Sequence, residues 1–187
     1  TEVDLDTVSP TVTVNQGATQ PDPTDVTPVA FDVLFSEAVT GFGAGGVAMG
    51  GTATGVTFDV NGSGAAYTIE VTAVAGDGTL VPDIAADTCQ DAAGNPNSAS
   101  TSTDNEVMFD TPPRVTVEQA VAQLDPANTF PVVFDVLFSE PVLGFEPGDV
   151  TMGGTATGVV FDLNGADASY TIEVTSAGDG TLVPSIG

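Results

Sequence analysis

Apolar and polar side chains alternate with a period of two along short segments of this chain. Residues 29 to 36 place Val, Phe, Val and Phe on one face and small or polar residues on the other, and residues 12 to 14 and 67 to 72 repeat the alternation. A period of two carried by β-branched and aromatic residues is typical of a half-buried β-strand. Apolar residues at helical spacing are absent, and 22 Gly and 13 Pro divide the chain into pieces too short for helices. The pattern predicts an all-β chain.

Turn-forming residues separate the predicted strands at the spacing of a β-sandwich. Each turn contains Gly, Asn or Asp, which accept a positive φ, or Pro, which fixes φ. About seven strands per repeat, with a break roughly every 8 to 12 residues, are typical of an antiparallel Greek-key sandwich. We therefore predict tandem immunoglobulin-like Greek-key β-sandwiches. The predicted core of the first one is Val12, Val14, Phe31, Val33, Phe35, Phe42, Phe58, Tyr67, Ile69, Val71, Leu80, Ile84 and Val107.

The two halves of the chain are copies of one another. The segment FDVLFSE at residues 31 to 37 returns at residues 134 to 140, at an offset of 103. At this offset, 40 of the 61 positions from Val12 to Thr72 are identical. A period near 100 residues indicates duplicated whole domains rather than the units of roughly 20 to 50 residues that build a solenoid.

The two ends of the sequence differ from a simple pair of repeats. Residues 1 to 7 (TEVDLDT) resemble residues 105 to 111 (NEVMFDT), whereas the second copy stops at Ile186-Gly187, which match Ile84-Ala85. We therefore interpret 1–7 as the last strand of a preceding or neighbouring repeat, 8–110 as the first repeat, and 111–187 as a second repeat that lacks its last strand.

Two explanations of these ends remain open. The chain is a window cut from a longer array, or residues 1–6 of one subunit complete the second repeat of the next by β-strand addition. The second arrangement would be a head-to-tail contact that does not close and would therefore build a filament. In either case the expected partners are neighbouring repeats of the same protein or identical subunits.

The net charge of the chain limits the classes of partner that it can bind. Twenty-six acidic residues face one basic residue, Arg114, so the formal net charge is −25. DNA, RNA and anionic membrane surfaces would repel such a chain, so we expect no nucleic acid partner. The acidity is consistent with cation binding and with a solvated surface suited to high salt, and both interpretations remain open.

Most catalytic mechanisms lack a required residue here. The chain contains no His and no Lys, which excludes Ser-His-Asp, Cys-His and Schiff-base arrangements. A carboxylate pair could hydrolyse glycosides, but there is no Trp and there are only two Tyr to stack on a sugar ring. We expect no enzymatic activity.

The single cysteine and the hydropathy add two further expectations. Cys89 cannot form an internal disulfide, so we expect a loop thiol, with an intermolecular link as the alternative. No run of about 18 apolar residues and no charged-then-apolar leader occurs, so we expect no membrane insertion in this segment.

Several motifs resemble one family. The chain is similar to the bacterial immunoglobulin-like repeats of very large surface adhesins and biofilm-associated proteins. The resemblance implies a tandem array in a secreted or cell-surface protein, and in that family many interdomain junctions bind calcium through Asp side chains. We therefore expect a structural Ca²⁺. The motifs are FSEAV (35 to 39), GGTATG (50 to 55), GDGTL (76 to 80), DAAGNPN (91 to 97) and DTPP (110 to 113).

The expected topology places acidic residues at the domain poles. Strands of a Greek-key sandwich alternate in direction, so the first loop, the loop before GTL and the exit of the last strand gather at one pole, against the start of the next domain. The predicted junction site is Asp77, Asp110 and Glu140, with Asp22 or Asp25 nearby. The equivalent upstream site is Asp6, Glu37 and Asp91.

These clusters have a second interpretation. All-oxygen clusters suit a hard cation such as calcium. Alternatively, Gly-Asp-Gly and Asp-Ala-Ala-Gly-Asn are only turns, in which Asp and Asn cap their own backbone. No spacing matches an EF-hand loop.

Two functional hypotheses follow. The first is a structural repeat segment of an extracellular or cell-surface protein, which gives length and stiffness to an adhesin stalk or filament. The alternative is a surface-binding module for a carbohydrate, a host surface or ice, which would use loops such as residues 41 to 51 or the threonines at 52, 54, 155 and 157. Because those loops are nearly identical in both copies, the structural repeat segment is the preferred hypothesis.

Overall fold

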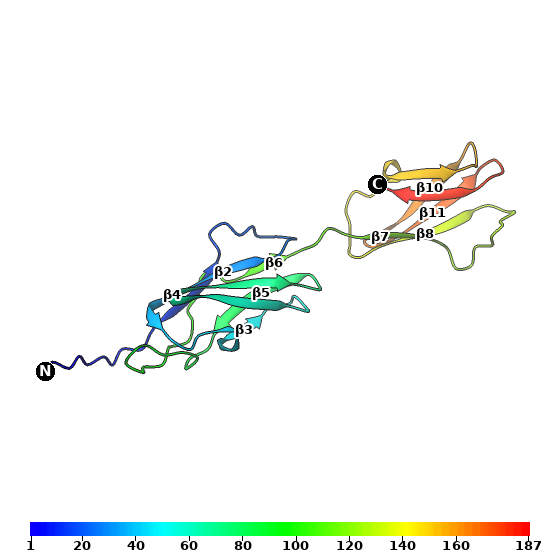
Figure 1. Ribbon diagram of the computed structural model, residues 1–187. Helices are drawn as coiled ribbons and strands as arrows, with labels where there is room; N and C mark the ends of the chain where they lie inside the picture. The colour runs from blue at the N-terminus through cyan, green and yellow to red at the C-terminus, as the bar shows by residue number, and fades with distance from the viewer. The chain divides into compact units, whose positions relative to one another are not determined.

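The computed structural model describes all residues, Thr1–Gly187, and divides into two compact units, Thr1–Thr111 and Pro112–Gly187. Each unit is built from antiparallel strands joined by turns, with one short 3₁₀ helix and no α-helix (Figure 1). The 3₁₀ helices are η1 (Ala44–Gly46) and η2 (Pro147–Asp149). The all-β prediction is confirmed.

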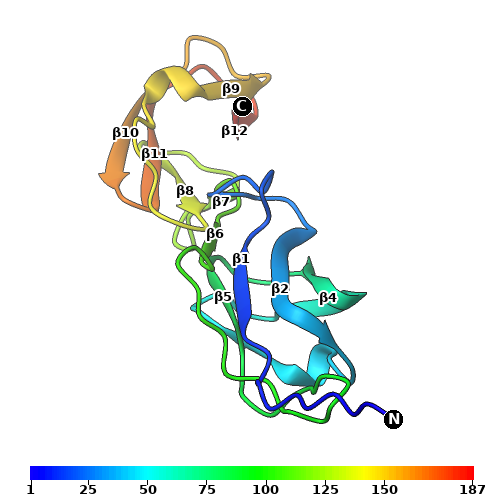
Figure 2. The same cartoon turned by 90° about the vertical axis from the view of Figure 1, so that its left-hand side faces the viewer.

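The first unit contains two three-stranded sheets. One sheet has the order β1-β2-β4 and consists of β1 (Val12–Gln16), β2 (Val29–Val39) and β4 (Thr57–Ala73). The other has the order β3-β5-β6 and consists of β3 (Val47–Gly50), β5 (Gly78–Ile84) and β6 (Val107–Phe109). Figure 2 shows β1 beside β2, where Val12 pairs with Phe35 and Val14 with Val33.

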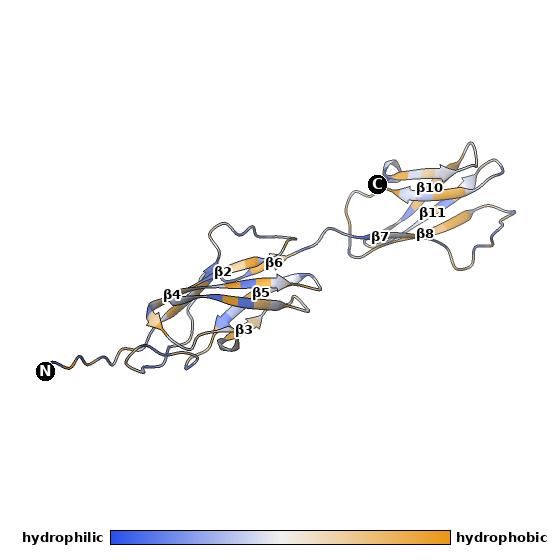
Figure 3. Ribbon diagram, in the orientation of Figure 1, coloured by the Kyte–Doolittle hydropathy of each residue, from blue (hydrophilic) through white to orange (hydrophobic).

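Buried side chains from both sheets form a single core in the first unit. In β2, Val29, Phe31, Val33 and Phe35 are buried while the residues between them lie outward, and Figure 3 shows orange and blue alternating along these strands. This is the two-residue period predicted from the sequence. Ten of the predicted core residues are buried, and Phe42, Phe58 and Tyr67 are half-buried against the same cluster.

Six strands form the first unit, rather than about seven, because β4 doubles back on itself. The hydroxyl groups of Thr57 and Thr72 lie 3.2 Å apart across the bend, and the Asn61 side chain donates to Glu70 at 3.0 Å. The second unit separates the same segment into two strands joined by a short turn.

The second unit repeats the first sheet and part of the second. One sheet has the order β10-β11-β8-β7 and consists of β7 (Val115–Gln119), β8 (Val132–Phe138), β10 (Val160–Ala166) and β11 (Ser169–Ser176). The other contains only β9 (Val150–Gly154) and β12 (Leu182–Ile186). No strand of this unit takes the place that β6 has beside β5.

The core of the second unit is correspondingly open. Leu80 of β5 is 0% exposed in the first unit, whereas its counterpart Leu182 is only half-buried. Phe31 and Phe134 show the same difference. Val136, Val150 and Ile172 form the buried cluster of the core in the second unit, and Val174 is also buried.

Candidate metal centre

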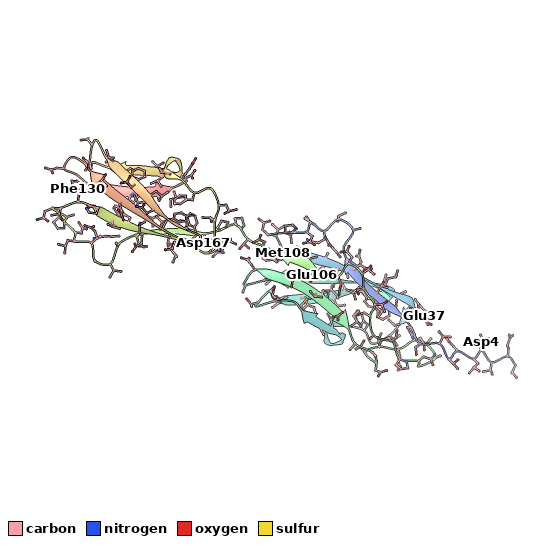
Figure 4. The ribbon with its side chains drawn as sticks, turned by 180° about the vertical axis from the view of Figure 1, so that it is seen from behind. Asp4, Glu37, Glu106, Met108, Phe130 and Asp167 are labelled. Carbon is pink, nitrogen blue, oxygen red and sulfur yellow. The ribbon has the colours of Figure 1, made fainter.

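Three carboxylates meet at one end of the first unit. Asp6 lies in the N-terminal segment, Glu37 lies near the end of β2, and Asp91 lies in the loop that follows β5. Each offers a carboxylate oxygen within 4.8 Å of the other two. Figure 4 shows Glu37 at the end of the unit from which the segment carrying Asp4 leaves. The structure thus brings together the upstream trio expected from the sequence, and calcium binding by it stays a prediction.

Asp91 is held in place by its own loop. Its Oδ1 accepts hydrogen bonds from the backbone N–H groups of Ala93 and Asn95, both at 2.8 Å, and its Oδ2 accepts one from Asn95 Nδ2 at 2.8 Å. Burial alone would raise the pKa of Asp91, but the hydrogen bonds from the Asn95 side chain and from the backbone of Asn95, Gly94 and Ala93 outweigh it and lower the pKa. The carboxylate is therefore fixed in its charged form.

The pKa of Glu37 is shifted in the opposite direction to that of Asp91. Its pKa is raised, first by burial and then by repulsion from Asp6 and Asp91. No basic side chain offsets this repulsion, because residues 1 to 111 contain no Lys, Arg or His.

The donor set fits a hard divalent cation. Calcium takes about six to eight oxygen ligands, mostly carboxylate, carbonyl and water oxygens. The three carboxylates would supply part of this set, and a cation between them would relieve the repulsion that raises the pKa of Glu37.

The other predicted residues of the first unit lie around the exit of β6. Asp77 and Asp110 each have a carboxylate oxygen within 4.8 Å of the other. Asp77 Oδ1 also accepts hydrogen bonds from the Thr111 backbone N–H at 3.0 Å and from the Thr111 hydroxyl at 2.9 Å. Asp77 Oδ1 therefore fixes Thr111, the last residue of the first unit, by two hydrogen bonds.

The remaining candidates lie on other segments of the chain. Asp22 Oδ1 accepts a hydrogen bond from the Met108 N–H at 2.9 Å, and Asp25 is exposed on the same loop. Glu140 lies just after β8 in the second unit. A junction site made of Asp77, Asp110 and Glu140 stays a prediction.

The family of the chain follows from its sequence and sandwich together. A family model for a bacterial Ig-like domain matches residues 6–107, which is more than half of the chain. The chain belongs to this family. No curated protein matches it.

The bacterial Ig-like domain is a non-enzymatic, structural fold that is typical of extracellular proteins. This membership supports a structural domain of a surface protein. No helix in either Ig-like unit has the length and apolar character needed to cross a membrane.

The sequence did not reveal the role of Asn97, the most heavily bonded side chain of the first Ig-like unit. Its Oδ1 accepts hydrogen bonds from the backbone N–H groups of Thr88 and Cys89, both at 2.9 Å. Its Nδ2 donates to the carbonyls of Ala85 at 2.9 Å and Ser98 at 2.8 Å. The DAAGNPN motif was the available signal, but turn propensity alone does not show that the last Asn is buried.

Cys89 lies in a loop, as predicted, but it is 7% exposed and belongs to the core cluster. Its Sγ lies 3.4 Å from Asn97 Oδ1, and burial raises the pKa of the thiol. A buried thiol with a raised pKa is poorly reactive.

Proposed function

We propose that this chain is a structural repeat segment of a secreted or cell-surface protein that gives length and stiffness to a stalk or extracellular filament. Such a segment is extended either by further repeats in one chain or by β-strand addition between copies. Structural Ca²⁺ at the acidic poles would fix the angle between successive Ig-like units.

The observation that carries the proposal is that the second copy preserves scaffold contacts in detail. Phe35, Phe42 and Tyr67 pack edge to face with ring centroids 5.0 to 5.9 Å apart. Their counterparts, Phe138, Phe145 and Tyr170, pack in the same way at 5.0 to 6.0 Å. Contacts of this kind stabilise a fold.

Polar contacts inside the loops are preserved as well. Gln20 Oε1 accepts a hydrogen bond from the Ala30 N–H at 2.9 Å, and Gln123 Oε1 accepts one from the Val133 N–H at the same distance. The Thr52 hydroxyl accepts a hydrogen bond from the Thr79 N–H at 2.9 Å, which occupies a threonine that the ice-binding alternative would need at a free surface. Because both copies preserve these internal contacts, the structural role is favoured over a binding module.

Calcium would act on geometry more than on folding. Extracellular modules bind calcium at roughly 10⁻⁴ to 10⁻³ M, so at millimolar calcium one site adds about 0.4 to 1.4 kcal/mol. This is small beside the stability of about 5 to 15 kcal/mol of a typical domain. The effect of calcium is therefore expected in the angle between units rather than in their melting.

The test is electron microscopy of single molecules in millimolar calcium and in excess chelator. Straight rods with calcium and variably bent rods without it support the proposal, whereas identical angle distributions overturn the calcium part of it. Glu140→Gln should abolish the calcium response, and Asp59→Asn, an exposed carboxylate outside both predicted clusters, is the matched control.

A further inference from the structure

One hairpin of the first Ig-like unit contains a sequence motif whose last residue the fold does not require. Asn61-Gly62-Ser63 lies where β4 doubles back on itself. Asn-x-Ser/Thr, with any residue except Pro in the middle, is the acceptor motif for N-linked glycosylation of exported proteins. Of the seven Asn residues of the chain, Asn61 alone is followed two positions later by Ser or Thr.

The motif is accessible on the surface of the unit. Asn61, Gly62 and Ser63 are all exposed. The preceding residue, Val60, packs against the core. Because successive side chains of a strand point to opposite faces, Asn61 points away from the core. Its amide is therefore open to solvent, as an acceptor group must be.

The motif also lies on a segment with a strand on one side only. In the second unit the equivalent segment is β10, which pairs with β11 and forms the edge of its sheet. In the first unit the segment returns onto the second half of β4, where the Thr72 hydroxyl donates to the Thr57 carbonyl at 3.3 Å. The sheet of the first unit ends at β4. Because an edge leaves one side unpaired, no further strand restricts the space beside Asn61.

The fold accounts for the glycine of the motif. Gly62 has a φ of 129°, and a Cβ there would lie 2.5 Å from the Ala66 carbonyl oxygen and 2.6 Å from Tyr67 Cα. Gly165 in the second unit has a φ of 134°, and its Cβ would lie 2.6 Å from Tyr170 Cα. A side chain does not fit at either position. Both hairpins therefore require glycine after the Asn.

The fold does not account for the hydroxyl of Ser63. The second unit keeps the Asn-Gly pair as Asn164-Gly165 but has Ala166 in the place of Ser63. Ala166 pairs with Ser169 in the same kind of hairpin. The hairpin thus forms without a hydroxyl at this position, and that hydroxyl is what completes the acceptor motif in the first unit.

We propose that Asn61 is an acceptor for N-linked glycosylation. The bond that forms joins Asn61 Nδ2 to the anomeric carbon of a sugar. The bond from that carbon to a polyprenyl diphosphate breaks, the diphosphate leaves with the electron pair, and one proton leaves the nitrogen. A transferase of the producing cell supplies this lipid-linked sugar donor. The inference rests on the proposed function for its setting, because the acceptor motif is used in exported proteins.

The modification is compatible with the contact that Asn61 makes. Asn61 Nδ2 donates to Glu70 Oε2 at 3.0 Å, and an unmodified side-chain amide carries two N–H donors. Glycosylation removes one of these hydrogens and leaves the other. The hairpin can therefore keep a hydrogen bond between Asn61 and Glu70.

The test is mass spectrometry of the chain isolated from the cells in which it occurs naturally. Cleavage of the denatured chain after Arg114, its single basic residue, gives fragments 1–114 and 115–187. We expect fragment 1–114 to be heavier than its sequence by a whole number of sugar residues, with the sugar on Asn61. Fragment 115–187 is the internal control, since Asn164 lacks the hydroxyl two positions later, and it should have the mass of its sequence.

Two variants made in the same cells separate the motif from the fold. Ser63→Ala should abolish the modification, and it should leave the Tm of the unglycosylated first unit unchanged because the second unit carries Ala at this position. Ser63→Thr, which keeps the motif, is the matched control and should remain glycosylated.

Each outcome decides the inference. It is overturned by a fragment 1–114 that has the mass of its sequence, or one that is changed only by conversion of Asn61 to Asp. A sugar that persists in Ser63→Ala, or one that is lost in Ser63→Thr, also overturns it. The calcium-dependent angle that tests the proposed function is measured on chains without a glycan, so the two can fail separately.

Discussion

Asn97→Ala is expected to destabilise the first Ig-like unit strongly. Asn97 is 2% exposed, and its side chain connects the loop after β5 to the segment that returns along β1. The substitution removes the partner of two backbone N–H groups and two carbonyls, at distances of 2.8 to 2.9 Å. Buried backbone groups without partners are costly.

The magnitude can be worked from these four bonds. Each contributes about 0.5 to 1.5 kcal/mol net, and some of the freed groups lie close enough to the surface to recover water. We therefore expect a loss of about 2 to 4 kcal/mol. For a unit of this length, 1 kcal/mol corresponds to about 4 °C in Tm, so the Tm should fall by about 8 to 16 °C.

Cys89 provides an assay that reports this unit alone. It is the only thiol of the chain, it is buried and it contacts Asn97. The labelling rate of the thiol, measured in the intact chain as a function of temperature, therefore follows unfolding of the first unit. Asn61→Ala, which removes one exposed hydrogen bond to Glu70, is the control and should shift Tm by no more than about 2 °C. If Asn97→Ala behaves like Asn61→Ala, the reasoning is refuted.

Asn97→Asp separates the accepting from the donating half of the side chain. The variant keeps an acceptor for Thr88 and Cys89 but places a carboxylate oxygen against the carbonyls of Ala85 and Ser98. The repulsion should raise the pKa of the new carboxyl group, so the variant should be least stable at neutral pH and recover part of its stability on acidification. A stability loss that does not depend on pH would contradict this explanation.

Three further predictions concern other positions. Asp167 has a φ of 58° at the position where the first copy has Gly64, with φ 68°. Asp167→Gly should therefore stabilise the second unit by about 0.5 to 1 kcal/mol in urea unfolding. A loss of stability would show that the backbone at Asp167 is not strained. The lowered pKa of Asp91 means that its stabilising contribution is present above the ordinary Asp pKa of about 4 and is lost as the pH falls further, so Asp91→Asn should flatten the acid side of the Tm profile. The pKa of Glu37 is raised, so its charge destabilises the folded unit at neutral pH, and Glu37→Gln should raise the Tm in chelator. The same variant should bind calcium more weakly in calorimetry. A fall in Tm would show that the charge of Glu37 does not destabilise the unit.

Periodicity identified the sandwich because it reports which face of a strand is buried. The alternation at β2 predicted its inward residues correctly, and the same alternation predicted β1 and the second half of β4. Phe42 and Tyr67 are less buried than predicted because they lie with Phe35 in an aromatic group at the edge of the core, where the Tyr67 hydroxyl donates to the Val39 carbonyl at 3.4 Å. Hydrophobicity alone does not distinguish the middle of a core from its margin.

The proximity of Asp6, Glu37 and Asp91 followed from topology, since alternating strands return their ends to the same pole. The pairing of Asp77 with Thr111 did not, because it depends on where one side chain points after β6 ends. The buried position of Asn97 was also not predictable, since its partners are backbone groups that any sequence would supply. Sequence patterns predicted which elements meet, and the structure was needed for individual hydrogen bonds.

The position of the only basic residue has a consequence for proteolysis. Arg114 lies just after the boundary between the units, and the remaining residues offer no Lys or Arg. Trypsin-like proteases, which require a basic residue, therefore have one cleavage point, and the hydrogen bond from the Ser139 N–H to the Arg114 carbonyl at 2.8 Å holds it in extended, paired backbone. The first unit therefore offers no cleavage site to this class of protease even when it unfolds, and the second unit offers only the one near its start.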